Sequence, residues 1–521
     1  MRKKATELKF RGEMKDIMIQ ITIKDKEFSY DMTALAQAFF PEKKCVIQED
    51  EKWRGRDGYT VCWEIDGERV FEHFEPSPYT KNDVKRQVYD FLCQYAKKKL
   101  PWGILTGVRP AKIPLRMLTE GRREEEIICL LQQEYRCSPE KTALVLDVAK
   151  REYALAGGID HENSRCLYIG IPFCPSICAY CSFSSYPAGQ YAGRMDAYLD
   201  AIEQELSYVA KTLAGKKLQA VYIGGGTPTA LHDQAFARLL DMVDQYLPME
   251  EVAEYTVEAG RPDSISEEKL HGMKEHRVSR ISINPQSMKQ HTLDLLGRKH
   301  SVEDVKRVYA RARELGFDNI NMDLIAGLPE ETPADFKQTL EEIVRMEPDS
   351  VTVHTLVIKR ASQMRREQME QGNGRREEDC RTGTMLKENR CIAAMQDEAE
   401  AFLREHGYGP YYMYRQKNKA FTTWNTNQEN VAYAKPGKEC LYNIVMMEEL
   451  ETVLALGSGG SSKIMFHEEN RMERVENVKN VEQYIERIDE MIRRKQKFLP
   501  DTKLLYAQKS NGTEVPRRKE V

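Results

Sequence analysis

The chain has 521 residues, of which 41% are hydrophobic and 31% are charged, and its formal net charge is -4. This length predicts two or three domains, and the near balance of charges excludes a global basic field, so we expect no nucleic-acid partner. No apolar run reaches the length of a membrane span, and no apolar signal core follows Met1. Because the 12 cysteines also lack the spacing of a disulfide framework, we expect a cytoplasmic protein.

Residues 1–160 are predicted to form a separate α+β domain. Apolar positions at helical spacing predict a helix over 82–99 and further helices within 112–156. No catalytic residue stands out, so this domain is interpreted as a packing or partner-binding module. Alternating apolar residues predict two hairpins, with strands at 17–23, 27–30, 59–65 and 69–74.

Residues 161–358 show a regular alternation of short apolar strands with amphipathic helices. Strands are predicted at 166–173, 220–224, 255–259, 279–284, 319–325 and 350–356. Helices are predicted at 195–213, 232–247, 266–276, 302–315 and 333–346. Six parallel strands with right-handed crossovers predict an incomplete (β/α)6 barrel, with a doubly wound open sheet as the alternative.

Polar residues at the carboxyl ends of these strands favour the barrel, because barrel enzymes carry their chemistry on that face. Residues 359–465 are interpreted as a short C-terminal extension that completes the mouth of the barrel. Residues 466–521 are predicted to form a charged helix and a tail.

Three cysteines follow the first predicted barrel strand, namely Cys174, Cys178 and Cys181. This spacing lets one loop supply three thiolates to a [4Fe-4S] cluster and leaves the fourth iron open for chemistry. A structural zinc site would need a fourth ligand, and Cys166 lies at the wrong end of the strand to provide it. Cysteines without any metal are the third alternative.

Further polar groups end the later strands. Glu258 and Asp323 follow apolar residues, where a carboxylate is unfavourable unless it pairs with a cation or binds a polar ligand. Gln286 and His354 can either bind a ligand or make hydrogen bonds that only stabilise the fold. The segment Gly224-Gly-Gly-Thr-Pro228 contains three glycines, which have no Cβ atom, so that a ligand can approach its backbone.

Together these motifs identify a resemblance. The chain resembles radical S-adenosylmethionine proteins of the oxygen-independent coproporphyrinogen III oxidase family in three motifs. These are Tyr168-Ile-Gly-Ile-Pro-Phe-Cys174-x3-Cys178-x2-Cys181, then Gly-Gly-Gly-Thr-Pro, then Asp323-Leu-Ile-x-Gly-Leu-Pro329. The resemblance covers about 166–465. Segments 106–110, 414–418 and 434–438 look most like its HemZ branch, coproporphyrinogen dehydrogenase.

The resemblance implies a [4Fe-4S] cluster on Cys174, Cys178 and Cys181, with S-adenosylmethionine bound at the open iron. It assigns no catalytic residue. The residues matching cofactor contacts are Tyr168, Gly225, Gly226, Thr227, Glu258, Gln286, Arg298 and Asp323.

The implied reaction converts two propionates of a porphyrinogen substrate to vinyl groups in heme biosynthesis, through a 5'-deoxyadenosyl radical. It needs a flavodoxin- or ferredoxin-like electron donor, and we expect a monomer. The tetracarboxylate substrate needs cations at the mouth, for which the sequence offers Arg261, Arg298, Arg415 and Lys417.

Two positions depart from the best-characterised branch of the family. Phe183 stands where that branch has a fourth cysteine, and Gly170 where it has histidine, which can remove a second cofactor site or a proton donor. Three alternatives therefore stay open, namely a heme carrier of the HemW type, a radical heme methyltransferase and a non-enzymatic metal-binding module. The His-Asn-x-x-Tyr-Trp segment expected of the carrier is absent from the sequence.

Overall fold

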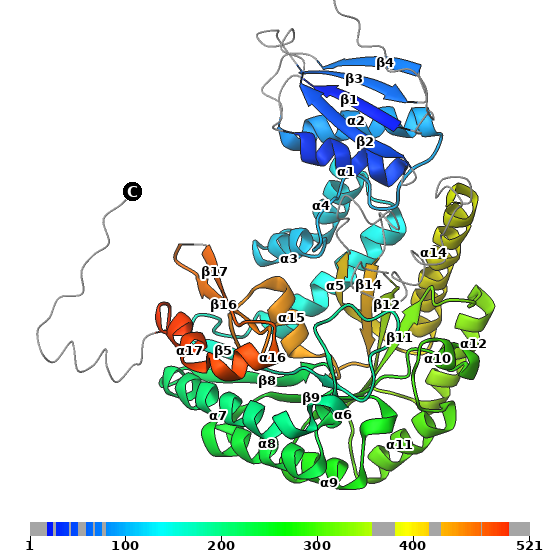
Figure 1. Ribbon diagram of the computed structural model, residues 1–521. Helices are drawn as coiled ribbons and strands as arrows, with labels where there is room; N and C mark the ends of the chain where they lie inside the picture. The colour runs from blue at the N-terminus through cyan, green and yellow to red at the C-terminus, as the bar shows by residue number, and fades with distance from the viewer. Residues whose placement is uncertain are drawn as a thin grey trace, which may run out of the picture.

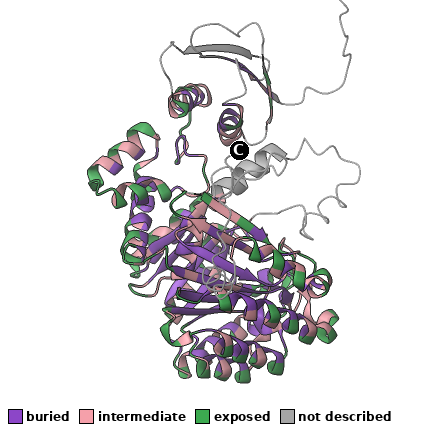
Figure 2. Ribbon diagram, turned by 90° about the vertical axis from the view of Figure 1, so that its left-hand side faces the viewer, coloured by how far each residue is buried: buried purple, intermediate pink, exposed green. Residues whose placement is uncertain are grey.

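The structure is a computed structural model that describes residues 18–23, 28–40, 43–49, 59–65, 68–74, 80–356, 381–415, 429–469 and 471–499. Figure 1 shows a small N-terminal sheet with its helices above a much larger α/β domain. In Figure 2 the central sheet of the large domain is mostly buried, whereas the outer faces of its helices are exposed.

The N-terminal sheet has the strand order β2-β1-β3-β4. Helices α1 and α2 pack on one face of it, where Ile21 and Trp63 meet Leu35, Phe39 and Val88 in a separate apolar core. The bounds are β1 Met18–Ile23, α1 Ser29–Phe39, β2 Lys44–Glu49, β3 Tyr59–Ile65, β4 Glu68–Phe74 and α2 Lys81–Ala96.

The structure confirms one of the two predicted hairpins. Strands β3 and β4 pair antiparallel, and the turn between them lies outside the described residues. The prediction of a strand at 27–30 was wrong, because helix α1 begins at Ser29. The apolar residues of this segment recur at helical spacing and are buried together, namely Phe28, Met32, Leu35 and Phe39. Their hydrophobic periodicity is therefore the 3.6 residues of a helix and not the 2 residues of a strand.

The helices between the two sheets pack with the large one. Trp102, Ile127, Leu144 and Val148 share the main core with the strands of the large sheet. The sequence-based boundaries at 160, 358 and 465 stay predictions. The bounds are α3 Lys112–Thr119, α4 Glu124–Cys129, the π-helical turn η2 Leu130–Glu134 and α5 Pro139–Ala156.

The large sheet has the strand order β13-β14-β12-β11-β10-β9-β8-β5-β15-β16-β17. Its central six strands are parallel and neighbour one another in chain order, as an incomplete (β/α)6 barrel requires. A doubly wound sheet would reverse its strand order, so that alternative is excluded. The six strands are β5 Ser164–Ile171, β8 Lys217–Gly225, β9 Glu254–Gly260, β10 Arg280–Ile283, β11 Ile320–Ala326 and β12 Ser350–Thr355.

Helices wrap the outside of these strands (Figure 1). All five predicted crossover helices are present, and a short helix, α10, which the sequence did not reveal, follows β10. The bounds are α7 Met195–Thr212, α8 Asp233–Tyr246, α9 Glu267–Glu275, α10 Gln290–Leu295, α11 Val302–Glu314 and α12 Pro333–Met346. Smaller elements are β6 Phe173–Cys174, β7 Tyr186–Pro187, α6 Ala188–Tyr191 and the 3-10 turns η3 Ala192–Arg194, η4 Pro228–Ala230, η5 Met249–Glu251 and η6 Pro262–Ser264.

The C-terminal extension adds strands to both edges of the six-stranded unit. β14 pairs antiparallel with β12, whereas β15 pairs parallel with β5 on the opposite edge. The prediction of one charged helix after 466 was wrong, because β17 comes first and Arg487 separates two short helices. The bounds are α14 Arg381–Glu405, β13 Gly409–Arg415, β14 Glu429–Ala434, α15 Leu441–Glu448, β15 Thr452–Leu456, β16 Ser461–Phe466, β17 Arg471–Glu476, α16 Val481–Glu486 and α17 Ile488–Gln496.

Helix α15 fills the interior of the partial barrel near the amino ends of the strands. The buried carboxylate of Glu254, the first residue of β9, accepts hydrogen bonds from the backbone N–H groups of Leu441 and Tyr442 at 2.6 and 3.1 Å. A carboxylate suits a helix N-terminus because of the helix dipole. Helix α15 thus covers the interior at the amino ends of the strands.

Among the described residues, no helix combines the length and the apolar character that a membrane crossing requires.

Candidate cofactor site

The cysteine loop leaves the carboxyl end of β5 and is held on one side by the glycine segment after β8. The N–H groups of Gly226 and Thr227 donate to the carbonyls of Ile171 and Phe173, each at 2.8 Å. A Cβ on Gly226 would lie 2.6 Å from the Phe173 carbonyl oxygen and 3.0 Å from Cys174 Sγ. This position therefore requires glycine, because the two segments approach each other so closely.

On its other side the loop contacts the chain after α10. Ser176 Oγ donates to the Gly297 carbonyl at 3.2 Å, and the Ala179 N–H donates to the Leu296 carbonyl at 3.1 Å. The connections after β8 and β10 therefore hold the cysteine loop from two sides.

The three thiols differ in their surroundings. Cys178 is buried, whereas Cys174 and Cys181 are half-buried. Arg261 and Arg298 each place Nη1 3.8 Å from Cys178 Sγ, and Thr227 Oγ1 lies 3.7 Å from Cys174 Sγ. Burial raises the pKa of Cys174 to about 11, a penalty that a bound cation would offset by favouring the thiolate.

This donor set fits a [4Fe-4S] cluster. No three His, Cys, Asp or Glu side chains converge on a single-ion site in the part of the chain that the structure describes. A cluster does not require the three sulfur atoms to converge on one ion, because each thiolate binds its own iron. Cys166 is excluded as a fourth ligand, since it is buried in the barrel interior beside Ala220 and Tyr222.

Glu258 lies at the carboxyl end of β9 and faces the glycine segment. Its Oε1 accepts from the Tyr222 hydroxyl at 2.6 Å, and its Oε2 accepts from the Gly225 N–H at 3.2 Å. Burial raises the pKa of Glu258 to about 7. The carboxyl group therefore changes charge near neutral pH, at the place where the resemblance expects a polar contact with the cofactor.

Three tyrosine rings line the interior below Glu258. Tyr168 and Tyr222 occupy paired positions on β5 and β8, and their ring centroids are 6.1 Å apart. Tyr442 of α15 stacks on Tyr222 at 4.5 Å. The matched residue Tyr168 thus belongs to an aromatic floor beneath the glycine segment.

Gln286 and Asp323 are brought together by an unusual backbone. Gln286 has φ of +70°, and its N–H donates to the Asp323 carbonyl at 3.0 Å. The Tyr180 hydroxyl, from the cysteine loop, donates to Gln286 Oε1 at 3.1 Å. This conformation turns the Gln286 side chain toward the cysteine loop and links the loop to β11.

Asp323 points into the interior, where Asn321 Nδ2 donates to its Oδ1 at 2.7 Å and His354 Nε2 lies 3.8 Å from its Oδ2. Burial alone would raise the pKa of Asp323, but His354 and Asn321 hold that pKa below its ordinary value. The same contact raises the pKa of His354 despite its burial. Glu258, Asp323 and His354 thus form an ionisable group at the mouth.

The cations expected to bind substrate have other partners. Arg261, Arg298 and Arg415 are 4%, 6% and 5% exposed, and each donates hydrogen bonds to carbonyl groups of the protein. Lys417 lies outside the described residues. Arg261 and Arg298 therefore support the fold around the cysteine loop, whereas Arg415 joins β13 to the segment before α3.

The two departures from the family pattern have distinct surroundings. A Cβ on Gly170 would lie 3.2 Å from the Leu456 carbonyl oxygen of β15, so a larger side chain would be in conflict with that neighbouring strand. Phe183 is 74% exposed at the end of the cysteine loop.

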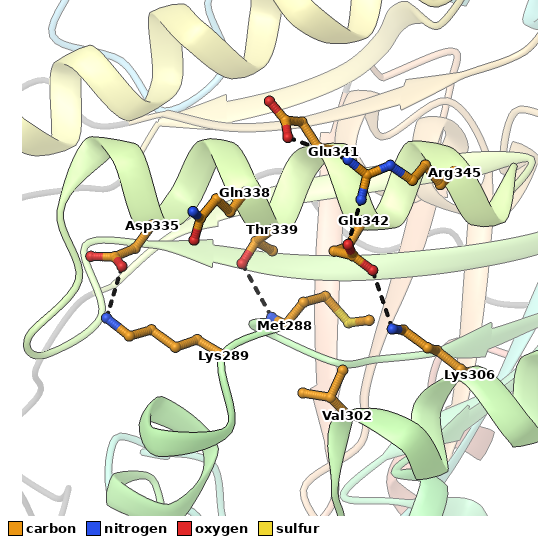
Figure 3. Close-up of a pocket in the computed structure, with 10 residues that line it drawn as sticks. All are labelled: Met288, Lys289, Val302, Lys306, Asp335, Gln338, Thr339, Glu341, Glu342 and Arg345. Atoms are coloured by element: carbon orange, nitrogen blue, oxygen red, sulfur yellow. Dashed lines mark hydrogen bonds and ion pairs between the residues drawn. The ribbon is translucent and has the colours of Figure 1, made fainter.

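A separate cavity of about 410 Å³ lies in the outer helical layer, between α12 and the segment from Met288 to Lys306 (Figure 3). Its charges pair with one another, as in Lys289 with Asp335 at 2.8 Å and Lys306 with Glu342 at 3.2 Å. None of the residues expected to bind the cofactors lines this cavity.

Sequence reasoning missed several residues of the site. Tyr222 could have been found, because it occupies the same inward position on β8 as Tyr168 does on β5. Tyr180 lies within the cysteine motif itself. Tyr442 carries no local signal, since it reaches the site from a helix far along the chain.

An incomplete barrel with three cysteines in the loop after its first strand defines a class of cluster-dependent proteins that bind their cofactor at the carboxyl edge. The comparisons agree with this class. Residues 168–343 match the model of the Radical SAM superfamily. The chain is 37% identical over 423 residues to the oxygen-independent coproporphyrinogen-III oxidase-like protein HemZ of Bacillus subtilis, covering 80% of this chain and 81% of that protein.

The chain therefore belongs to the radical SAM superfamily and, within it, to the family of the oxidase-like protein HemZ. Membership confirms the expected cofactors, a [4Fe-4S] cluster and S-adenosylmethionine.

Two further similarities are more limited. The heme chaperone HemW of Bacillus subtilis is 38% identical over 193 residues, which are 37% of this chain and 50% of that protein. The solved structure of coproporphyrinogen III oxidase (HemN) from Escherichia coli aligns with a TM-score of 0.48 and 23% identity, covering 66% of this chain and 72% of that chain.

Proposed function

We propose that this protein catalyses the oxygen-independent oxidative decarboxylation of coproporphyrinogen III to protoporphyrinogen IX. The observation that carries the proposal is the 37% identity to the coproporphyrinogen-III oxidase-like protein HemZ along 80% of this chain. We propose a cytoplasmic monomer that receives electrons from a flavodoxin- or ferredoxin-like donor.

In this proposal Cys174, Cys178 and Cys181 hold the cluster. Gly225, Gly226 and Thr227 present backbone to S-adenosylmethionine, while Tyr168, Glu258, Gln286, Arg298 and Asp323 surround its polar groups. The geometry supports this assignment, because Glu258 and the glycine segment share a hydrogen bond and Tyr180 joins the cysteine loop to Gln286. The cofactors, when bound, supply a 5'-deoxyadenosyl radical that removes one hydrogen atom from the β-carbon of a propionate.

Loss of carbon dioxide and of one electron to an acceptor then leaves each propionate as a vinyl group. The protein's part is to position that carbon and to exclude water. Helix α15 and the tyrosines Tyr168, Tyr222 and Tyr442 close the interior from below, so the reacting groups meet in a site that opens on one side.

A heme carrier of the HemW type is the second candidate, and the similarity to the HemW chaperone over 193 residues favours it. A carrier would bind heme at the same mouth without forming a vinyl product.

One anaerobic experiment separates the two. The reconstituted protein is incubated with reductant, S-adenosylmethionine and coproporphyrinogen III, and a Cys178→Ala variant is the control for cluster dependence. We expect protoporphyrinogen IX and 5'-deoxyadenosine from the wild type only. Stoichiometric binding of heme, added in place of the porphyrinogen in a parallel sample, with no vinyl product from the first sample would instead support the carrier, and failure of both would refute the two candidates together.

A further inference from the structure

We propose that Arg261 is a positioning residue for the cluster, which fixes Cys178 and, together with Arg298, raises the reduction potential of the cluster by placing positive charge at that cysteine. This inference concerns the cofactor, which the family defines, and it does not depend on the identity of the substrate.

Arg261 is held rigidly from one side. It follows the last residue of β9 and donates from Nε to Asp263 Oδ1 at 2.9 Å and from Nη2 to Asp263 Oδ2 at 2.6 Å. Two parallel hydrogen bonds to one carboxylate fix the plane of a guanidinium group. The residue is 4% exposed, so water does not compete for these donors.

The remaining donors of Arg261 reach the cysteine loop. Nη1 donates to the Ser176 carbonyl at 2.9 Å and to Ser176 Oγ at 2.8 Å, and it lies 3.8 Å from Cys178 Sγ. Arg261 therefore connects the carboxylate of Asp263 to the backbone between the first two cysteines, and this fixes where the Cys178 sulfur lies.

A second guanidinium approaches the same sulfur from another βα connection. Arg298 Nη1 lies 3.8 Å from Cys178 Sγ, and its Nη2 donates to the Asn284 carbonyl at 2.5 Å. Cys174 lies near the neutral Thr227 hydroxyl, whose Oγ1 is 3.7 Å from its Sγ. Two guanidinium groups thus lie within 3.8 Å of the middle cysteine of the motif.

The charge has a direct consequence for redox chemistry. When the donor passes one electron to the cluster, the cluster gains one unit of negative charge. Buried positive charges nearby stabilise that reduced state, and hydrogen bonds to the ligating sulfur act in the same direction. Arg261 and Arg298 should raise the potential, and the Asp263 carboxylate should partly oppose them.

Because the two charges have opposite effects, variants of Arg261 and Asp263 should shift the midpoint potential of the cluster in opposite directions. Arg261→Gln removes a positive charge and should shift the midpoint potential of the cluster to more negative values. Asp263→Asn removes a negative charge and should shift it to more positive values. The measurement is an anaerobic potentiometric titration followed by electron paramagnetic resonance, and a tenfold change in the reduced-to-oxidised ratio at fixed potential corresponds to about 59 mV.

Arg311→Gln is the matched control, because Arg311 pairs with Glu267 and Glu314 on the outer helices and should leave the potential unchanged. If Arg261→Gln assembles no cluster, Asp263→Asn still decides the matter through its upward shift. A merely structural role would lower the iron content of both variants without opposite shifts in potential. Equal potentials in the wild type and both variants, or shifts of the same sign, would overturn the proposal.

Discussion

The Tyr222 hydroxyl donates a hydrogen bond of 2.6 Å to Glu258 Oε1, which joins the aromatic floor of the barrel to the carboxylate beneath the glycine segment. Burial raises the pKa of Glu258 to about 7, and the hydrogen bond from Tyr222 opposes that rise. The protonation state of Glu258 near neutral pH therefore depends on Tyr222.

We expect the affinity for S-adenosylmethionine to increase as pH rises through about 7, because Glu258 then becomes an ionised acceptor for the polar groups of the cofactor. Glu258→Gln should remove this pH dependence and weaken binding at pH above 7 by about 1.5–3 kcal/mol. Anaerobic equilibrium dialysis of the reconstituted protein measures both effects.

Tyr222→Phe serves as the companion variant. Without the hydroxyl the pKa of Glu258 rises further, so the rise in affinity should move to higher pH. If the profile of Glu258→Gln matches that of the wild type, Glu258 does not contact the cofactor.

The contact between Gly226 and the cysteine loop leads to a second prediction. Gly226→Ala places a methyl group 2.6 Å from the Phe173 carbonyl oxygen, so the loop must move, at about 1–3 kcal/mol. We expect a marked loss of iron and of the cluster absorbance after anaerobic reconstitution. Gly193→Ala is the control, because nothing lies within 4 Å of the Cβ it would add. Equal iron content in the two variants would contradict the prediction.

The repeating part of the fold was predictable from the sequence. Each barrel strand is buried on both faces and each crossover helix has one apolar face, so the two periods alternate clearly over residues 164–355. The error at 27–30 arose because a short apolar stretch fits either period, and only the burial of Leu35 and Phe39 decides for the helix.

The cysteine loop was predictable because its ligands are close together in the sequence. The contacts of Tyr442 and Arg261 were not predictable from the sequence. Tyr442 stacks on Tyr222 from a helix more than 200 residues later, and no local pattern encodes that contact. Arg261 was expected to face the substrate, but Asp263, two residues further on, turns its guanidinium toward the cysteines.

Buried acids far from the cysteines give a prediction about stability. Both carboxylate oxygens of Glu152 on α5 and of Glu448 on α15 are buried without hydrogen-bond partners. Burial raises the pKa of Glu448 to about 7, and burial together with the charge of Glu448 raises the pKa of Glu152 well above its ordinary value.

The folded state therefore keeps protons that the unfolded chain releases above about pH 4.5, so the free energy of unfolding should fall as pH rises from about 4.5 to 7. For one such group the loss is on the order of 3 kcal/mol. Glu152→Gln should be more stable than the wild type at pH 8, as measured by urea denaturation. Glu125→Gln, at an exposed position, should change nothing, and a destabilised Glu152→Gln would show that the ionised form is needed.

The last prediction concerns how the C-terminal extension is attached. Lys495 Nζ of α17 lies 2.5 Å from Glu205 Oε1 of α7, and both side chains are 0% exposed. The other oxygen of Glu205 accepts from the Gly457 N–H at 3.0 Å, directly beside β5 and Gly170. Lys495→Met leaves Glu205 buried without its cation, which should destabilise the protein by about 3–5 kcal/mol in urea denaturation.

The double variant Glu205→Gln/Lys495→Met should recover much of this loss, because no uncompensated charge then remains buried. Lys497→Met, at an exposed position on the same segment, is the control for loss of a lysine. If Lys495→Met is no less stable than Lys497→Met, the ion pair does not anchor the extension. A destabilised single variant with a recovered double variant would instead show that charge compensation at Glu205 holds α17 and the Gly457 turn against the first strand of the barrel.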